Sequence, residues 1–268
     1  MSEALAAPKR SRRIYTLKAD TEIYKAIAKY QFLTAEMATK ILRRDESTVR
    51  KRFLGLYEAG HLNRARRDLL APYVYFLGEK GAEEAARMGY LPEVRFIKSK
   101  SRLIINHDLE ITLFHLVLEK KLHDAGHLLA SWDQWRGDLK DEVETDRGTA
   151  SLIPDAYFVI NEDAFFLEVV KSYESEYEDG ESNIVRKVGL YHEYKNRFRE
   201  KYGAEDFRVL WVLPTKARVL GLLSKLEDSF PYRRFYFTDE ESYKKNMLGK
   251  IWWTPKDFRE ATYSLMGF

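Results

Sequence analysis

The order of helix and strand signals in residues 20–88 is the feature that most limits the fold of this chain. Apolar residues at helical spacing predict four helices, over 20–30, 34–42, 46–59 and 79–88. Between the third and the fourth, two stretches have the composition of strands, 61–66 and 72–77. Helix, helix, turn, helix and then a two-stranded ribbon is the order of a winged helix-turn-helix domain. We therefore predict such a domain over residues 19–90.

The third of these helices carries most of the residues that we expect to contact DNA. Asp45 stands at its predicted start and Gly60 just after its end, where Asp caps helices and Gly stops them. Its apolar residues share one face, and the opposite face carries short hydroxyls and long cations, which suit base edges and phosphates. With the preceding turn and the ribbon, the predicted DNA contacts are Arg43, Arg44, Ser47, Thr48, Arg50, Lys51, Arg52, Arg64, Arg66 and Arg67. The alternative is an ordinary solvated basic face.

Charge is divided unevenly along the chain. Residues 1–100 contain 21 Lys and Arg against 12 Asp and Glu, a net +9, whereas residues 101–268 contain 24 against 30, a net −6. This division favours two modules, of which the basic one faces a polyanion. Residues 1–18 are predicted to be a basic flexible arm that either contacts phosphates or is a solvated tail. Residues 138–181, with 14 acids and three bases, are expected to be solvated loops such as DLKDEVETD, or else a surface that contacts protein or mimics DNA.

The rest of the chain has the pattern of a second, mixed domain. Residues 91–102, which include Pro92 and a basic run, are predicted to be a linker. Helices are expected over 103–122, 183–202 and 216–228. Strands are expected near 128–135, 153–160, 164–170, 207–214 and 233–239. We therefore predict an α+β protein, in which the winged helix is followed by an α/β domain with a mixed sheet over residues 103–268.

Two carboxylates of this second domain form the pattern that suggests chemistry. Asp155 follows Pro154 at the start of one predicted strand, and Glu168 lies on the strand expected to pair with it. Metal-dependent nucleases often hold Mg²⁺ between such an Asp and Glu, because a hard cation needs oxygen ligands. Such enzymes also place a lysine at the next position on the same face, where it orients the attacking water.

The lysine does not fit this pattern well. Side chains alternate along a strand, so Lys171 points away from Glu168 unless a bulge intervenes. Lys187, on the following helix, is a substitute, and Glu110 on the long helix is a candidate third acid. The candidate catalytic set is thus Glu110, Asp155, Glu168, Lys171 and Lys187, with Asp155 and Glu168 as ligands of Mg²⁺ or Mn²⁺. In the alternative, Asp155 caps the strand entry, Glu168 pairs with Lys187 or Lys171, and no cofactor is bound.

Composition excludes several other classes of protein. The chain has no cysteine and only six histidines, so disulfides, thiol catalysis and thiolate zinc sites are excluded, and a structural metal site is not expected. No run approaches 18 apolar residues, and the N-terminus lacks the apolar segment of a signal peptide. We expect a cytoplasmic protein without membrane contact.

Three segments together resemble the replication-relaxation family of plasmids and mobile elements. They are LTAEMATKILRRDESTVRKRFLGLYEAGHLNR, NHDLEITLFHLVL, and IPDAYFVINEDAFFLEVVKS with the later RKVGLYHEY, and the resemblance covers roughly residues 20–220. It implies a winged helix joined to a restriction-endonuclease-like fold of the PD-(D/E)xK type. It also implies DNA binding tied to plasmid replication, transfer or transcription control. Family members usually keep the Pro-Asp and the Glu, whereas an acidic residue followed by Arg often stands where Val170 and Lys171 stand here.

We therefore predict a sequence-specific protein that binds double-stranded DNA and regulates transcription, replication or transfer of a plasmid or mobile element, with an inactive nuclease-like domain. The alternative is a metal-dependent endonuclease or nickase that the winged helix targets to DNA. A homodimer is expected because one recognition helix reads few base pairs, and a replication or transfer protein is a further expected partner. The aromatic residues of the tail are either a dimer interface or part of the core: Trp252, Trp253, Phe258, Tyr263 and Phe268.

Overall fold

The computed structural model describes residues 18–91, 101–134, 139–146, 148–171, 183–227 and 234–267. The chain forms two units, residues 1–116 and 117–268. Nearly all of the predicted basic arm and linker lie outside the described residues. Helix α5 (Arg102–Asp124) begins in the first unit and ends in the second, and the predicted start of the second domain at residue 103 stays a prediction. Within the described ranges, no helix is long and apolar enough to span a membrane.

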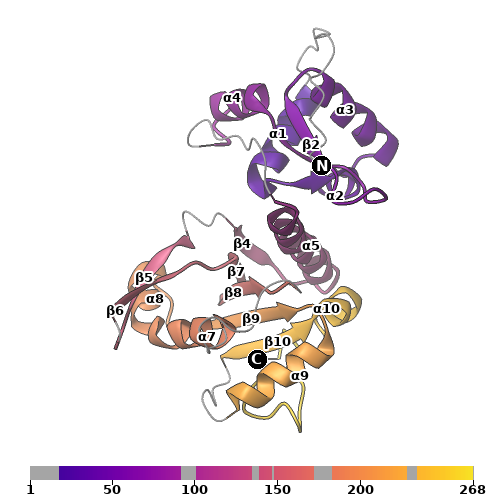
Figure 1. The fold of residues 1–268 in the computed structure, drawn as a ribbon. Coiled ribbons are helices and arrows are strands. Elements are labelled where there is room, and N and C mark those ends of the chain that lie inside the picture. The colour runs from indigo at the N-terminus through magenta and orange to yellow at the C-terminus, as the bar shows by residue number, and fades with distance from the viewer. Residues whose placement is uncertain are drawn as a thin grey trace. The chain divides into compact units, whose positions relative to one another are not determined.

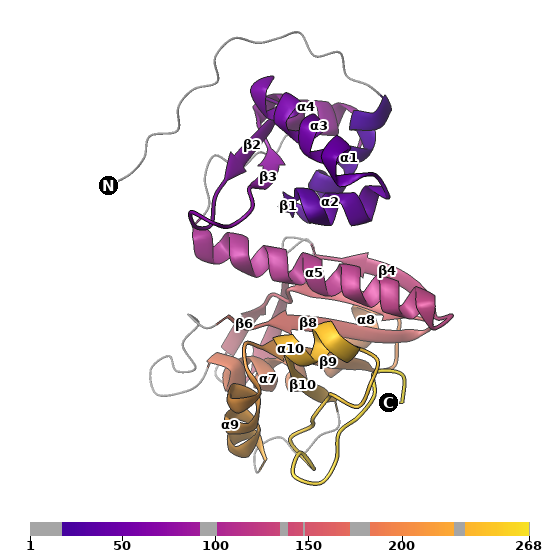
Figure 2. The ribbon, with the colours of Figure 1, turned by 90° about the vertical axis from the view of Figure 1, so that its right-hand side faces the viewer.

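The first unit combines helices with a small antiparallel sheet (Figure 1). Four helices precede α5 in the described residues: α1 (Lys18–Tyr30), α2 (Ala35–Leu42), α3 (Glu46–Glu58) and α4 (Glu79–Arg87). Three strands, β1 (Leu33–Thr34), β2 (Leu62–Ala65) and β3 (Val74–Leu77), form a sheet in the order β1-β3-β2. Figure 2 shows β2 and β3 as a hairpin that projects beside the helices.

Local signals in the sequence explain where these helices begin and end. The Thr34 hydroxyl accepts a hydrogen bond from the backbone N–H of Met37 (3.2 Å) and so caps α2. Gly60 ends α3 with φ +78°, a left-handed conformation that glycine adopts without steric cost. One apolar cluster joins the sheet to the start of α5, and its buried members are Phe32, Val74, Phe76, Ile105 and Leu109. All four predicted helices of residues 20–88 are present, whereas β1 was not predicted.

The second unit is built on a mixed five-stranded sheet in the order β10-β9-β8-β7-β4. Its strands are β4 (Leu129–Asp133), β7 (Ala156–Ile160), β8 (Asp163–Val169), β9 (Phe207–Leu213) and β10 (Phe235–Asp239). The strands β8, β9 and β10 run parallel, whereas β4, β7 and β8 pair antiparallel. The prediction of an α+β protein with a mixed sheet is therefore confirmed.

Helices α7 (Asn183–Glu193) and α9 (Lys216–Leu226) cover one face of this sheet, as Figure 2 also shows. Apolar residues of both helices share a core with the strands, including Val188, Leu223, Phe166, Trp211 and Phe237. The predicted single helix over 183–202 was wrong, because α7 ends at Glu193 and α8 (Lys195–Tyr202) follows. Helix α10 (Glu240–Asn246), which begins at the capping side chain of Asp239, was not predicted.

The acidic region also differs from the expectation. The segment DLKDEVETD was expected to be a solvated loop, but β5 (Asp141–Thr145) forms there and pairs with β6 (Gly148–Leu152). Val143 and Leu152 bury their side chains in the core of the unit, which explains why this acidic stretch is ordered as a hairpin. Residues 138, 147 and 172–181 of the acidic stretch lie outside the described residues.

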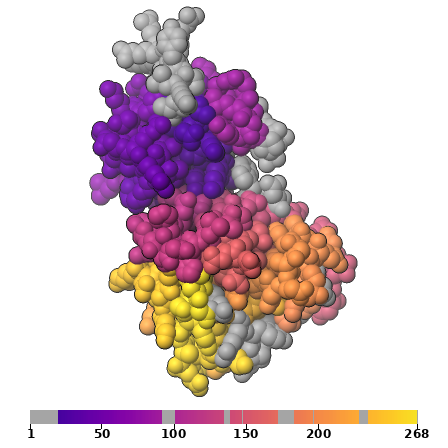
Figure 3. All heavy atoms as spheres, turned by 180° about the vertical axis from the view of Figure 1, so that it is seen from behind, coloured from indigo at the N-terminus to yellow at the C-terminus, as the bar shows by residue number. Residues whose placement is uncertain are grey.

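The aromatic tail belongs to the core where the structure describes it. Trp252 and Trp253 are buried, and their backbones bridge to Tyr263 and Phe237. The C-terminal segment, yellow in Figure 3, forms part of the surface of the second unit while these side chains point inward. Of the two alternatives, a dimer interface or the core, Trp252 and Trp253 therefore belong to the core. Phe268 lies outside the described residues.

Candidate functional site

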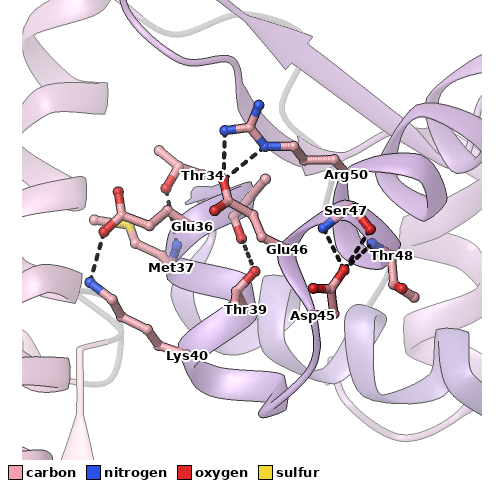
Figure 4. A network of polar contacts seen from close by, with 11 residues as sticks. Thr34, Glu36, Met37, Thr39, Lys40, Asp45, Glu46, Ser47, Thr48 and Arg50 are labelled. Carbon is pink, nitrogen blue, oxygen red and sulfur yellow. Dashed lines mark hydrogen bonds and ion pairs between the residues drawn. The ribbon is translucent and has the colours of Figure 1, made fainter.

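The first candidate site is the outer face of α3, whose first turn is fixed by Asp45. Its Oδ1 atom accepts hydrogen bonds from the backbone N–H groups of Ser47 (2.9 Å) and Thr48 (3.2 Å) and from the Ser47 hydroxyl (Figure 4). These bonds, the one from the Ser47 hydroxyl foremost, lower the pKa of Asp45. Because the cap satisfies N–H groups that a helix leaves unpaired, the turn that bears both hydroxyl residues has a fixed geometry.

Polar and basic side chains of α3 face outward. Four predicted contacts are exposed, namely Ser47, Thr48, Arg50 and Lys51, while Val49, Phe53 and Leu56 are buried on the opposite side. Arg50 pairs with Glu46 one turn earlier at 2.6 Å (Figure 4). An exposed pair at this spacing contributes only about 0.3–0.5 kcal/mol, so a phosphate can replace Glu46 at little cost. The outer face of α3 is therefore accessible to an anionic partner.

The turn between α2 and α3 adds two more cations. Arg43 is exposed and ends α2 in the left-handed conformation with φ 50°, its backbone N–H donating to the Thr39 carbonyl. A residue with a Cβ pays about 1–2 kcal/mol in this region, whereas glycine does not. Arg44, next to it, is half-buried. A cation thus stands at a turn position where glycine would be less strained.

Arg52 has a different environment from the other predicted contacts. Its guanidinium forms two hydrogen bonds to the carboxylate of Asp20 on α1, whose side chain is fully buried. Asp20, the largest influence, raises the pKa of Arg52. This ion pair holds α3 against α1, which is a structural task. The DNA contact predicted for Arg52 stays a prediction.

The arginines of the hairpin are stacked on tyrosine rings. The Arg64 guanidinium lies 4.2 Å from the ring centre of Tyr57 on α3 and 4.2 Å from that of Tyr73. Arg66 lies 4.3 Å from the Tyr73 ring. A guanidinium on an aromatic face is attracted by the ring and keeps its N–H edges available for a ligand. We call the four residues Tyr57, Arg64, Tyr73 and Arg66 the arginine–tyrosine stack; it joins α3 to the hairpin.

Neither tyrosine of this stack was predicted from the sequence to belong to the site. Tyr57 shares a face of α3 with the buried Phe53, yet it is only half-buried, and the Arg64 guanidinium lies over its ring. The pairing of the two strands would have indicated Tyr73: Arg64 pairs with Tyr75 and Ala65 with Val74, so Tyr73 lies near Arg66. This pairing could not be predicted, because the sequence alone does not show how many residues form the turn between the strands. Arg67, the last predicted contact of the hairpin, is half-buried.

The second candidate site is the carboxylate pair of the β7–β8 hairpin. Ala156 pairs with Leu167, so Asp155 and Glu168 are the next two residues and lie beside each other. Both are buried. The Oδ2 atom of Asp155 accepts the backbone N–H of Val169 at 2.8 Å. The hairpin therefore brings the two predicted acids together, and one of them holds the backbone of the neighbouring strand.

Two side chains of α7 reach Glu168. Lys187 Nζ lies 2.6 Å from Oε2 and also donates to the Ile153 carbonyl at 2.8 Å, and the Tyr191 hydroxyl donates to Oε1. Burial raises the pKa of Glu168 to about 7, although Lys187 acts in the opposite direction. Burial also raises the pKa of Tyr191 well above its ordinary value, so this hydroxyl keeps its proton. Both oxygens of Glu168 are thus engaged by α7.

The other two predicted catalytic residues are Lys171 and Glu110, and their roles stay predictions. Lys171 pairs with Glu240 of α10 at 2.7 Å, and Glu110 lies half-buried on the part of α5 that belongs to the first unit. In the described ranges, no group of three or more His, Asp or Glu residues is arranged to hold a metal ion. Both Glu168 oxygens accept bonds from α7 and Asp155 Oδ2 accepts one from Val169, so the protein itself supplies partners for three of the four carboxylate oxygens.

Residues 24–206 match the sequence family described as replication-relaxation, which is more than half of the chain. The chain belongs to the replication-relaxation family. The match includes α3, the hairpin and the carboxylate pair, and it confirms the resemblance carried by the three sequence segments. Membership connects the protein with replication of plasmids or mobile elements.

Other comparisons add distant similarity only. No curated protein sequence matches this replication-relaxation protein. Among solved structures, the crystal structure of protein VC1899 from Vibrio cholerae is similar with a TM-score of 0.34 and 13% sequence identity. The similarity covers 84% of this chain and 49% of that protein, so the chain spans about half the length of its structural neighbour.

Proposed function

We propose that residues 18–91 form a winged helix-turn-helix module that binds duplex DNA, and that this member of the replication-relaxation family uses it to control replication, transfer or transcription of a plasmid or mobile element. In this proposal α3 is the recognition helix and the β2–β3 hairpin is the wing. The order of α1, α2, α3, β2, β3 and α4 supports the assignment.

The arginine–tyrosine stack is the observation that carries the proposal. Tyr57 belongs to α3 and Tyr73 to the hairpin, so Arg64 between them keeps hairpin cations beside the recognition helix. Arginines that are already ordered lose less conformational entropy when they bind phosphate than mobile ones do. The exposed Lys51 and Arg50 supply cations on the helix itself. Helix and hairpin together offer a preformed basic surface.

Backbone strain at Arg43 supports the same surface. A residue held in a costly conformation indicates that its side chain serves a purpose there, and Arg43 precedes the capped start of α3. A phosphate contact by this exposed guanidinium is a purpose that glycine cannot fulfil. We therefore include Arg43 with Lys51, Arg50, Arg64 and Arg66 in the proposed contact surface.

For the second unit we propose a structural role without DNA cleavage. The engagement of Glu168 by Lys187 and Tyr191 supports this choice, because the protein itself supplies a partner for each of its oxygens. A homodimer and a replication or transfer partner remain proposals, the first tested by sedimentation with and without DNA. The tail tryptophans are unsuitable as the dimer contact since they are buried.

Binding of the full chain to duplex DNA tests the proposal. The probe is a labelled duplex from the region upstream of its own gene, titrated at several salt concentrations. If Lys51 contacts a phosphate, Lys51→Ala should weaken binding and reduce the slope of log affinity against log salt by about 1. The matched control is Lys120→Ala, an exposed lysine of α5 that pairs with Asp124. Absence of binding near micromolar concentration, or equal salt slopes for Lys51→Ala and the parent, would contradict the proposal.

Incubation of the same protein with supercoiled plasmid tests the non-cleaving role. We expect no nicking with Mg²⁺ and at most traces with Mn²⁺. Robust cleavage that Asp155→Asn and Glu168→Gln each abolish would establish the endonuclease alternative instead. Loss of DNA binding in these two variants would also count against separate roles for the two units.

A further inference from the structure

The tip of the β2–β3 hairpin carries two leucines that are almost fully exposed among the described residues. Among the exposed large apolar side chains of the described residues, Leu69 and Leu70 are the most exposed, at 87% and 97%. Isolated apolar residues on a surface are common, but two adjacent leucines at the end of a projecting hairpin contribute nothing to a core. Their position indicates that they contact a binding partner.

The turn that presents these leucines is held in shape by Asp68. Its Oδ1 atom accepts the backbone N–H groups of Leu70 (2.9 Å) and Ala71 (2.7 Å). This local bonding is typical of an aspartate that stabilises a turn. Pro72 follows and limits the backbone further. The leucines are therefore displayed by an ordered turn, and little entropy is lost when they enter a partner.

The surroundings of the leucines specify the chemistry of that partner. Arg66 and Arg67 precede Asp68 directly, and Arg64 and Arg66 belong to the arginine–tyrosine stack at the base of the hairpin. A matching partner must be polyanionic at its edges and apolar where the leucines enter. Duplex DNA offers this arrangement, because phosphates line the minor groove and the apolar base faces become accessible where a wedge unstacks a base step. The hairpin is also continuous with the surface that we propose for α3.

We propose that Leu69 and Leu70 form a wedge that enters the minor groove and partly opens one base step, thereby bending the DNA beside the site read by α3. This inference rests on the proposed function. Leucine is among the side chains that act as such wedges, and flexible pyrimidine–purine steps open at the lowest cost. The arginines hold the backbones on either side of the groove while the leucines unstack the step. A protein that bends DNA in this way suits replication, which requires duplex opening or wrapping.

Ligase-mediated circularisation tests the wedge without a known binding sequence. The probe is a linear duplex of about 120 bp, which is shorter than the roughly 150-bp persistence length and closes slowly unless a protein bends it. We compare the full chain with the double variant Leu69→Ser, Leu70→Ser, and with Leu220→Ser as the matched control. Leu220 is an exposed leucine on α9, in the second unit.

We expect the parent and Leu220→Ser to accelerate circularisation about tenfold and the double variant to lose this acceleration. The double variant should still bind the duplex, within about tenfold of the parent affinity and with the same salt slope, since its cations are unchanged. Equal circularisation by the parent and the double variant, with binding intact in both, would overturn the wedge but leave the proposed function standing. Failure of the parent to bind any duplex would instead overturn the proposed function.

The other partners that an apolar tip could take are distinguished by two further measurements on the same variants. If the leucines served a lipid surface, the parent would float with vesicles of anionic phospholipid and the double variant would not. If they served a second copy of the chain, sedimentation would show a smaller species for the double variant in the absence of DNA. Either result combined with unchanged circularisation would overturn the wedge.

Discussion

Glu168→Gln offers a direct measurement of what burial does to the carboxylate pair. The carboxyl is buried among Tyr191, Lys187 and the sheet, and burial raises its pKa from 4.5 to about 7. Below pH 4.5 the group is protonated in both the folded and the unfolded chain. As the pH rises from 4.5 to about 7, the unfolded chain loses the proton while the folded chain keeps it. The free energy of unfolding must therefore fall across this window and level off above it.

The size of this effect follows from the pKa difference. One pH unit between the two pKa values corresponds to about 1.4 kcal/mol, so Glu168 can destabilise the unit by at most about 3 kcal/mol between pH 4.5 and pH 8. Glutamine does not ionise, and Glu168→Gln should lack this loss. Relative to the parent, the variant should thus gain up to about 3 kcal/mol on going from pH 4.5 to pH 8. Groups that do not interact with Glu168 titrate alike in both proteins and cancel in the comparison.

Tryptophan fluorescence during denaturant unfolding is the appropriate assay. All five tryptophans lie in residues 117–268, so the signal reports the unit that contains Glu168. Glu162→Gln, in the exposed turn between β7 and β8, is the matched control and should follow the pH profile of the parent. Parallel profiles for Glu168→Gln and the parent would refute the reasoning, because the carboxyl would then ionise equally in both states. DNA affinity should not change in either variant.

Two further predictions concern the first unit. Arg52→Ala should lower its free energy of unfolding by about 3 kcal/mol, because the buried Asp20 carboxylate loses its guanidinium partner, whereas the exposed Lys51→Ala should change it by less than about 0.5 kcal/mol. Hydrogen exchange of α1 and α3 amides measures both values, and equal effects would be inconsistent with the ion pair as described. Arg43→Gly should raise stability by up to about 1 kcal/mol by relieving the left-handed backbone, yet weaken DNA binding about threefold to tenfold. If Arg43→Gly bound DNA as tightly as the parent, Arg43 would not belong to the proposed contact surface.

Helices with strong local signals were predictable from the sequence. The caps Thr34 and Asp45 and the terminal Gly60 act through neighbours in the chain, so residues 34–60 contain the information that starts and stops α2 and α3. The same holds for the β7–β8 hairpin, in which Asn161 at φ 53° occupies the turn between two apolar strands. In these segments local preference and tertiary packing favour the same structure.

Elements that depend on distant partners were not predictable. The two-residue strand β1 is too short for alternation to be visible, and it exists because β3 pairs with it. The acidic strand β5 has the composition of a loop, but pairing with β6 and burial of Val143 determine its structure. Arg52 has the same sequence signature as Arg50, and only the position of Asp20, 32 residues earlier, assigns it to an internal ion pair.

The carboxylate pair shows most clearly where sequence reasoning ends. An Asp and a Glu on paired strands are equally compatible with a metal site and with a structural cluster, because the hairpin places both acids side by side in either case. What differs is the helix that covers them. Helix α7 brings Lys187 to one oxygen of Glu168 and the Tyr191 hydroxyl to the other, so these oxygens are satisfied by the protein itself. Strand alternation predicted that Lys171 points away from Glu168, and in the structure Lys171 pairs with Glu240 while Lys187 pairs with Glu168. The contact of Lys187 depends on how α7 crosses the sheet, which no local pattern encodes. Two acids at the right spacing are therefore insufficient evidence for cleavage. The groups that contact the carboxylate oxygens are also needed to distinguish a metal site from a structural cluster.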